Sequence, residues 1–158
     1  MQRVPMTPAG HVALTAELKH LKEVVRFQIV RDIEEARAHG DISENSEFED
    51  AKHRQALTEG RIRELEGKLA ASEVIDITRI PASDRVIFGV TVDLEDLTSE
   101  DEVTYQIVGT DEANVKDGKI SVTSPIGRAL VGREVGDEIT VRAPGGLRKY
   151  VIVDVHYK

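Results

Sequence analysis

The sequence of 158 residues contains no cysteine and no tryptophan, and its aromatic side chains are limited to three phenylalanines and three tyrosines. Because cysteine is absent, the chain can form neither a disulfide framework nor a thiolate metal or redox site. It also lacks an apolar run of membrane-spanning length and a charged-then-apolar leader with a cleavage site. We therefore expect a cytoplasmic protein that has no membrane partner.

A positive excess of charge is missing as well. The chain has 21 Lys and Arg against 29 Asp and Glu, a formal net charge of -8. The acidic excess is present in both parts, with 12 basic against 15 acidic residues in 1–80 and 9 against 14 in 81–158. This balance argues against attraction of the whole surface to nucleic acid, so such contact would need a protein partner or a locally basic face.

Two long helices are predicted in the N-terminal part. In residues 7–39 apolar side chains recur at steps of three and four, Thr7 and Pro8 are typical of a helix start, and His39 with Gly40 is typical of a helix end. A second segment, about 45–73, repeats the pattern with a and d spacing, although it has polar side chains in the part of the seam nearer the turn. The short connection predicts an antiparallel hairpin.

The pattern changes after residue 74, where β-branched residues dominate. Residues 85–94, 102–108 and 149–157 are typical of strands in an antiparallel sheet with one covered face, and Ser124 with Pro125 predicts the start of a short helix. The fold class is therefore α+β. We expect a coiled-coil arm in residues 1–76 with an acidic tip at 40–48, a linker at 77–84 and a small globular domain in residues 85–158.

The turn of the hairpin reads HGDISENSEFED and is crowded with carboxylates: Asp41, Glu44, Glu47, Glu49 and Asp50. Helix capping and the helix dipole explain one or two acids near a helix start, but not five. The alternative explanation is a cation. Mg²⁺ is held by one or two carboxylates together with oxygen atoms from elsewhere, and Asp41 and Glu44, three residues apart, could share an ion that a partner helps to bind.

At this point the sequence resembles a known family. The hairpin with HGDISENSEF at its turn, together with SPIGRALVGREVGDEITVRAPGG at 124–146, resembles the bacterial Gre transcript-cleavage factors over essentially the whole chain. The stretches MTPAG, EGRIRELEGKL, VIDITRIP and RVIFGVTV look like the GreA type in particular, which the acidic balance also favours.

The resemblance implies a function. Family members have a globular domain of FKBP-like fold that docks on RNA polymerase at the rim of its secondary channel, while the coiled coil enters the channel. Asp41 and Glu44 match the family's two essential tip acids, which help the polymerase to hold a second Mg²⁺ for hydrolysis of the 3′ end of backtracked RNA. By this resemblance the chain is not itself an enzyme, and it would bind the shared ion only weakly on its own.

Other site residues follow from the same resemblance. Arg37 and Lys52 would approach the phosphates of the nascent RNA, although a solvated helix face with local ion pairs is the simpler explanation of these two residues. Asn45 and Phe48 would support the tip, and Phe48 stands where members commonly have tyrosine. Docking on the polymerase would use the segment around these residues: Ser121, Ser124, Pro125, Ile126 and Leu130.

Two alternatives remain beside this interpretation. The coiled coil could be a dimerisation or adaptor element whose acids serve solubility, or the chain could be an inhibitory paralogue of the Gfh type, which lacks cleavage activity. The spacing of Asp41, Glu44 and Asn45 favours a cleavage-competent factor, and we expect a monomer. Because aromatic side chains are scarce, prolyl isomerase activity is not expected from the FKBP-like domain.

Overall fold

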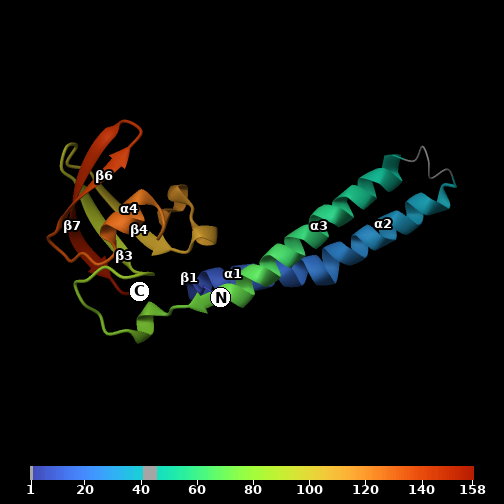
Figure 1. The fold of residues 1–158 in the computed structure, drawn as a ribbon, viewed down its shortest axis with the longest axis horizontal. Helices are drawn as coiled ribbons and strands as arrows, with labels where there is room; N and C mark the ends of the chain where they lie inside the picture. Colours follow the sequence, from blue (N-terminus) through green and yellow to red (C-terminus); the bar gives the residue numbers. More distant parts are fainter. Residues whose placement is uncertain (1, 41–45) are drawn as a thin grey trace. The chain divides into compact units, whose positions relative to one another are not determined.

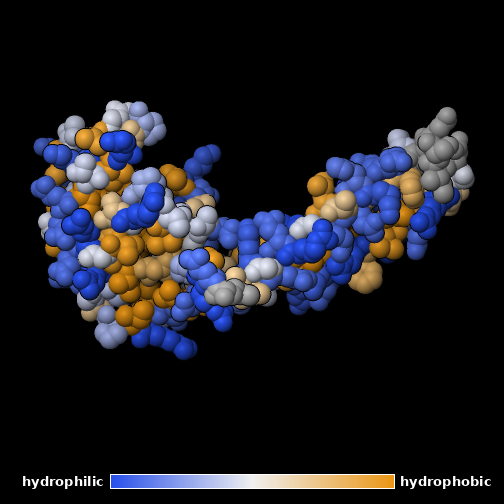
Figure 2. All heavy atoms as spheres, in the orientation of Figure 1, coloured by the Kyte–Doolittle hydropathy of each residue, from blue (hydrophilic) through white to orange (hydrophobic). Residues whose placement is uncertain are grey.

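The computed structural model describes residues 2–40 and 46–158, which form two compact units (Figure 1). The first is a helical hairpin of residues 11–71, and the second is a sheet unit of residues 2–10 and 72–158. Among the described residues, no helix combines the length and the apolar character needed to cross a bilayer. Figure 2 shows hydrophilic side chains over much of the visible surface of each unit.

The helices and turns have the following bounds: α1 Pro8–His20, a π segment Leu21–Val25, α2 Arg26–Ala38, α3 Ser46–Ala71, and α4 Pro125–Leu130, with 3-10 turns at Ile77–Arg79, Thr110–Glu112 and Val115–Asp117. The strands are β1 Val4–Met6, β2 Ser72–Val74, β3 Thr91–Asp96, β4 Glu102–Val108, β5 Lys119–Ser121, β6 Glu138–Ala143 and β7 Gly146–His156.

The first long helix begins and ends where the sequence predicts, but it is not a regular α-helix throughout. The hydroxyl of Thr7 accepts a hydrogen bond of 3.1 Å from the Gly10 N–H, as expected of an N-cap, and Gly40 has the positive φ of a helix end, 89°. The π segment Leu21–Val25 interrupts it. Apolar residues there follow each other at steps of four. On a helix with 3.6 residues per turn, each such step rotates the apolar position by about 40° around the helix axis, and the wider π turn reduces this rotation.

As predicted, the seam of the hairpin is apolar away from the turn, and the predicted polar positions nearer the turn, Gln55 and Thr58, are partly buried. Its most buried side chains on α3 are Leu65 (0% exposed), Ala51 (0%) and Ile62 (3%), and a separate cluster near the turn joins Ala51 to Ile29 and Ile33 of α2. Ion pairs between the facing helices, which the sequence pattern did not predict, flank the seam: Lys22–Glu66, Arg26–Glu59, Asp32–Arg54 and Glu17–Arg61.

The second unit contains a five-stranded sheet in the order β5-β4-β3-β7-β6. All its pairings are antiparallel, as predicted, except that the short edge strand β5 runs parallel to β4. Side chains from one face of the sheet form the core together with α4, whose Leu130 is fully buried. Ser124 caps α4, since its hydroxyl accepts the Gly127 N–H at 3.1 Å.

The strand expected at 85–94 is shorter than predicted, because regular pairing in β3 begins at Thr91. The predicted inward face is nevertheless confirmed: Val86, Val90, Val92 and Leu94 are 0% exposed and Phe88 is 9% exposed. Gly89 has φ 93°, which bends the chain ahead of β3. Alternating burial therefore continues through a segment that does not pair as a strand.

The boundary between the units also differs from the expected one. Residues 2–10, which the sequence assigned to the arm, belong to the sheet unit because β1 pairs in parallel with β2 and the Glu112 carboxylate accepts the N–H groups of Thr7 (3.1 Å) and Gly109 (3.0 Å). Ile77, expected in the linker, is 6% exposed and belongs to the core, so the exposed connection is 78–85.

Candidate functional site

The candidate site is the end of the hairpin where α2 and α3 are connected. Asp41, Glu44 and Asn45, the tip residues singled out in the sequence, lie outside the described residues, so their predicted roles stay predictions. The structure does describe both flanks of this segment, from α2 through Gly40 and from Ser46 onward.

The two flanks are joined by a contact between His39 and Glu47, which is an ion pair when the imidazole is protonated. His39 follows the last residue of α2, and its Nδ1 lies 3.3 Å from Oε2 of Glu47 in the first turn of α3. The sequence predicted a helix-terminal position for His39, which is confirmed, because its N–H bonds the Ala36 carbonyl at 3.2 Å. One of the five acids of the turn thus has a partner on the opposite helix.

Arg54 contacts two carboxylates near the tip, one on each helix. This guanidinium lies 3.1 Å from Oδ2 of Asp32 on α2 and 3.3 Å from Oδ2 of Asp50 one turn earlier on α3. The i,i+4 spacing of Asp50 and Arg54 was visible in the sequence, whereas the contact with Asp32 depends on the register between the two helices. Sequence reasoning therefore missed Arg54 as a link between α2 and the start of α3.

These side chains surround a small open hollow of about 210 Å³ on the hairpin, lined by Asp32, Glu35, His39, Glu47, Asp50 and Arg54. Four carboxylates there face one guanidinium and one imidazole, so the flank of the tip is locally negative.

Phe48 anchors the start of α3. Its ring is partly buried against the cluster of Ile29, Ile33 and Ala51, so the packing at the seam predicted for this residue is present. The guanidinium carbon of Arg37 lies 5.9 Å from the centre of the Phe48 ring, within range of a cation–π contact. Arg37 therefore lies over the same ring that packs the start of α3 against the buried cluster.

The second predicted basic residue, Lys52, is exposed on α3, and its Nζ donates to the side-chain oxygen of Gln55 at 3.2 Å. Both cations lie within two turns of the acidic segment, on the last turn of α2 and the second turn of α3.

The hairpin that carries the tip is held by bidentate ion pairs closer to its other end. Arg26 donates hydrogen bonds of 3.0 and 2.8 Å to the two carboxylate oxygens of Glu59, and Arg61 donates bonds of 2.7 and 3.0 Å to those of Glu17. These hydrogen bonds are the main reason why the pKa values of Glu59 and Glu17 are lowered. Paired geometry of this kind fixes the register of the two helices.

The predicted docking segment lies in the sheet unit. Ser121 ends β5, and its carbonyl accepts the Ser124 hydroxyl at 2.6 Å, while Pro125 is exposed and Ile126 is partly buried. Leu130 is 0% exposed, so its side chain packs α4 onto the core and offers no surface to a partner.

Family comparisons agree with this architecture. The family described as "Transcription elongation factor, N-terminal" matches residues 4–74, and that described as "Transcription elongation factor, GreA/GreB, C-term" matches residues 81–157. The chain belongs to the GreA/GreB family of transcription elongation factors.

Individual relatives of this GreA/GreB family chain are similar over their whole length. It is 57% identical to transcription elongation factor GreA of Hyphomonas neptunium, covering 100% of both chains, and 54% identical to that of Methylococcus capsulatus, covering 99% of each. The solved structure of Gfh1 from Thermus thermophilus is 31% identical, with 98% of this chain and 99% of that chain covered and a TM-score of 0.44. By its identity to the curated relatives, the chain is a transcription elongation factor of the GreA type.

Proposed function

We propose that this elongation factor acts with RNA polymerase and stimulates the polymerase to cleave the 3′ end of backtracked nascent RNA, while the factor itself is no catalyst. The supporting observation is a helical hairpin, in a chain of the GreA/GreB family, whose connection carries the acidic segment. In this proposal the hairpin enters the secondary channel of the polymerase and the sheet unit docks at its rim.

The dimensions of the hairpin are compatible with this role. Helix α3 has 26 residues and therefore spans about 39 Å at 1.5 Å per residue. Two helices side by side are about 20 Å wide with their side chains. A hairpin of this length and width could bring a few carboxylates to a site that lies deep inside a partner.

The metal role in this proposal belongs to Asp41 and Glu44. Their donor set fits Mg²⁺, which prefers carboxylate oxygens and is commonly completed by groups from elsewhere. Of the other tip acids, Glu47 lies against His39 and Asp50 against Arg54, so these two already have partners. When bound jointly with the polymerase, the ion would supply Lewis-acid stabilisation of charge during phosphodiester hydrolysis.

The described side chains would then position the tip and the RNA. Phe48 and the pairs His39–Glu47 and Asp32–Arg54 hold the start of α3 against α2. Arg37 and Lys52 would attract the phosphates of the extruded RNA. In the sheet unit, Ser121, Ser124, Pro125 and Ile126 would contribute to docking.

The test is the release of short 3′ RNA fragments from purified backtracked elongation complexes in the presence of Mg²⁺. We expect cleavage with the unchanged factor and its loss with Asp41→Asn and with Glu44→Gln, while binding to the polymerase, measured separately, stays the same. Glu49→Gln is the matched control, since it removes one acid from the first turn of α3 outside the proposed pair.

Other outcomes would assign a different function. Tight binding without cleavage would make the chain an inhibitory paralogue of the Gfh type. Absence of both binding and cleavage, together with a stable oligomer in solution, would support the adaptor alternative. Retained cleavage in both tip variants would overturn the metal role of Asp41 and Glu44.

A further inference from the structure

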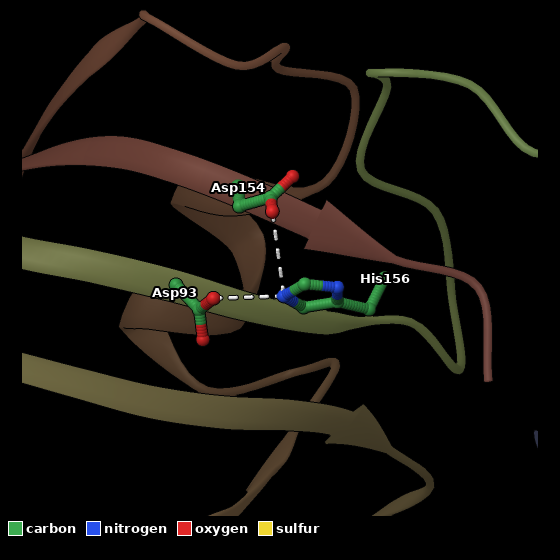
Figure 3. A group of neighbouring side chains, drawn as sticks. All are labelled: Asp93, Asp154 and His156. Atoms are coloured by element: carbon green, nitrogen blue, oxygen red, sulfur yellow. Dashed lines mark hydrogen bonds and ion pairs between the residues drawn. The ribbon is translucent and has the colours of Figure 1, made fainter.

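Three side chains with metal-binding chemistry converge within the sheet unit (Figure 3). Asp93 comes from β3, and Asp154 and His156 come from β7. Oδ2 of Asp93 lies 2.7 Å from Nε2 of His156, and Oδ2 of Asp154 lies 3.6 Å from the same nitrogen. Within residues 2–40 and 46–158 this is the one group of three such residues with donor atoms inside 4.8 Å of one another.

The register of the sheet explains why these residues meet. Asp93 is paired directly with Asp154 across the β3–β7 ladder, and His156 follows two residues later on the same face of β7. The register shifts between Asp93 and Leu94, so an irregularity of the ladder lies beside the cluster. The neighbours Val92 and Val155 point into the core, which directs the three polar side chains to the opposite, solvated face.

The second oxygen of each carboxylate is held by a group outside the cluster. The Thr104 hydroxyl on β4 donates to Oδ1 of Asp93 at 2.8 Å, and the Val155 N–H donates to Oδ1 of Asp154 at 2.9 Å. Both Oδ2 atoms are therefore turned toward the imidazole nitrogen. Hydrogen bonds from neighbouring groups orient the ligands of protein metal sites in this way.

We propose that Asp93, Asp154 and His156 bind a divalent transition-metal ion of the Zn²⁺ type. An imidazole nitrogen with two carboxylate oxygens suits Zn²⁺, whereas Mg²⁺ and Ca²⁺ prefer oxygen ligands alone. Ligands at Zn–N and Zn–O distances of about 2.0 to 2.2 Å stand roughly 3 to 3.5 Å apart, so the 2.7 and 3.6 Å separations need only small side-chain rotations.

The competing interpretation is an ion pair between His156 and the two aspartates without any metal. A metal ion would take the place of the proton that Nε2 of His156 shares with Asp93, because a ligand nitrogen must be deprotonated. The side chains are 33% (His156), 32% (Asp93) and 56% (Asp154) exposed, so water can complete the coordination. The bound ion would link the C-terminal end of β7 to β3.

The test is Zn²⁺ binding by the full chain, measured by isothermal titration and by equilibrium dialysis with metal analysis. We expect Asp93→Asn and His156→Gln each to lower the number of bound Zn²⁺ ions by one per chain. The Zn²⁺ affinity of the site should fall by more than about 100-fold, which is the upper end of the loss caused by mutating a residue that only hydrogen-bonds to a metal ligand. His53→Gln is the matched control, because His53 is an exposed histidine on α3, and this substitution should leave the number of bound ions unchanged. Counting the difference from the unchanged chain separates this site from any ion held at the tip acids.

A positioning variant makes the test more specific. Thr104→Val keeps the β-branched shape on β4 but removes the hydroxyl that holds Asp93, and we expect Zn²⁺ affinity to fall by about tenfold. Thr104→Ser restores the hydroxyl and should restore the affinity. The nuclear magnetic resonance signals of the His156 ring should shift on adding Zn²⁺ and stay unchanged on adding an equal concentration of Mg²⁺.

The proposal would be overturned by either of two results. One is the absence of saturable Zn²⁺ binding by the unchanged chain, and the other is an unchanged stoichiometry in both Asp93→Asn and His156→Gln while circular dichroism shows them to be folded.

Discussion

Arg61 Nε and Nη2 donate hydrogen bonds of 2.7 and 3.0 Å to the two carboxylate oxygens of Glu17, 44 residues away on the facing helix of the hairpin. This bidentate contact ties α1 to α3 and lowers the pKa of Glu17, chiefly through the hydrogen bonds themselves. It is one of the contacts that hold the two helices of the hairpin in register.

We expect Glu17→Gln to lower the free energy of unfolding of the hairpin by about 0.5 to 1 kcal/mol at pH 7, since both side chains are more than a third exposed and solvent screens the pair. Because the folded-state pKa of Glu17 is lowered from 4.5, this contribution is fully present above that value and is lost as the pH falls through the lower folded pKa.

Urea unfolding followed by helical circular dichroism at pH 7 and pH 3 would measure this effect. The difference between Glu17→Gln and the unchanged chain should shrink at pH 3, while Glu23→Gln, an exposed carboxylate of the π segment, should have little effect at either pH. An equal difference at the two pH values would show that the ion pair does not stabilise the hairpin.

A second prediction concerns the seam. Leu65 is 0% exposed, and Leu65→Ala should cost about 2 to 5 kcal/mol of hairpin stability because it leaves a cavity between the helices. Leu57 on the same helix is 61% exposed, so Leu57→Ala should change the stability by no more than a few tenths of a kcal/mol. Unfolding in urea measures both, and similar losses in the two variants would contradict the assigned seam.

Periodicity predicted the hairpin well because burial in a two-helix seam depends on local spacing alone. Leu65 and Ile62 could be placed from their positions on α3, and Ser124 from the chemistry of a helix start. The ion pairs between helices could not be predicted in this way. Arg61 also pairs with Glu64 three residues later on α3, a contact that local spacing allows, whereas its contact with Glu17 depends on the register of the two helices.

The sheet unit shows the same limit for long-range pairing. Alternation correctly identified the buried face of residues 86–94, but it could not show that pairing in β3 begins at Thr91. The parallel contact of β1 with β2 joins segments 68 positions apart and has no local signal, so residues 2–10 were assigned to the arm. The cluster around His156 depends on the β3–β7 register in the same way, so local spacing in the sequence does not predict it.

The start of α4 gives a third prediction. A Cβ added at Gly127 would overlap the backbone oxygen of Ser121, the same oxygen that accepts the Ser124 hydroxyl at 2.6 Å. We expect Gly127→Ala to destabilise the sheet unit by about 1 to 3 kcal/mol, because α4 must move away from β5. Thermal unfolding would show a lower Tm for this variant.

Gly145, in the turn between β6 and β7, is the matched control for that substitution. A Cβ there meets no atom within 4 Å, and no positive φ is required at this position. Gly145→Ala should therefore leave the Tm nearly unchanged. An equal Tm for Gly127→Ala and Gly145→Ala would mean that the close approach of α4 to β5 does not constrain the unit.

The last prediction tests the proposed RNA contacts of the tip. Arg37 lies over the Phe48 ring at 5.9 Å, and Lys52 is exposed one turn further along α3, so either cation could reach phosphates near the tip. Arg37→Ala and Lys52→Ala should each reduce cleavage by about two- to fivefold, the equivalent of at most about 1 kcal/mol for one exposed charge contact. The reduction should weaken as salt rises, because attraction to phosphates is screened.

Arg63→Ala is the control, because it removes an exposed cation far along α3 from the tip and should leave cleavage unchanged. If binding to the polymerase falls in parallel with cleavage, these cations contact the protein partner instead, and if neither changes, they form a solvated helix face.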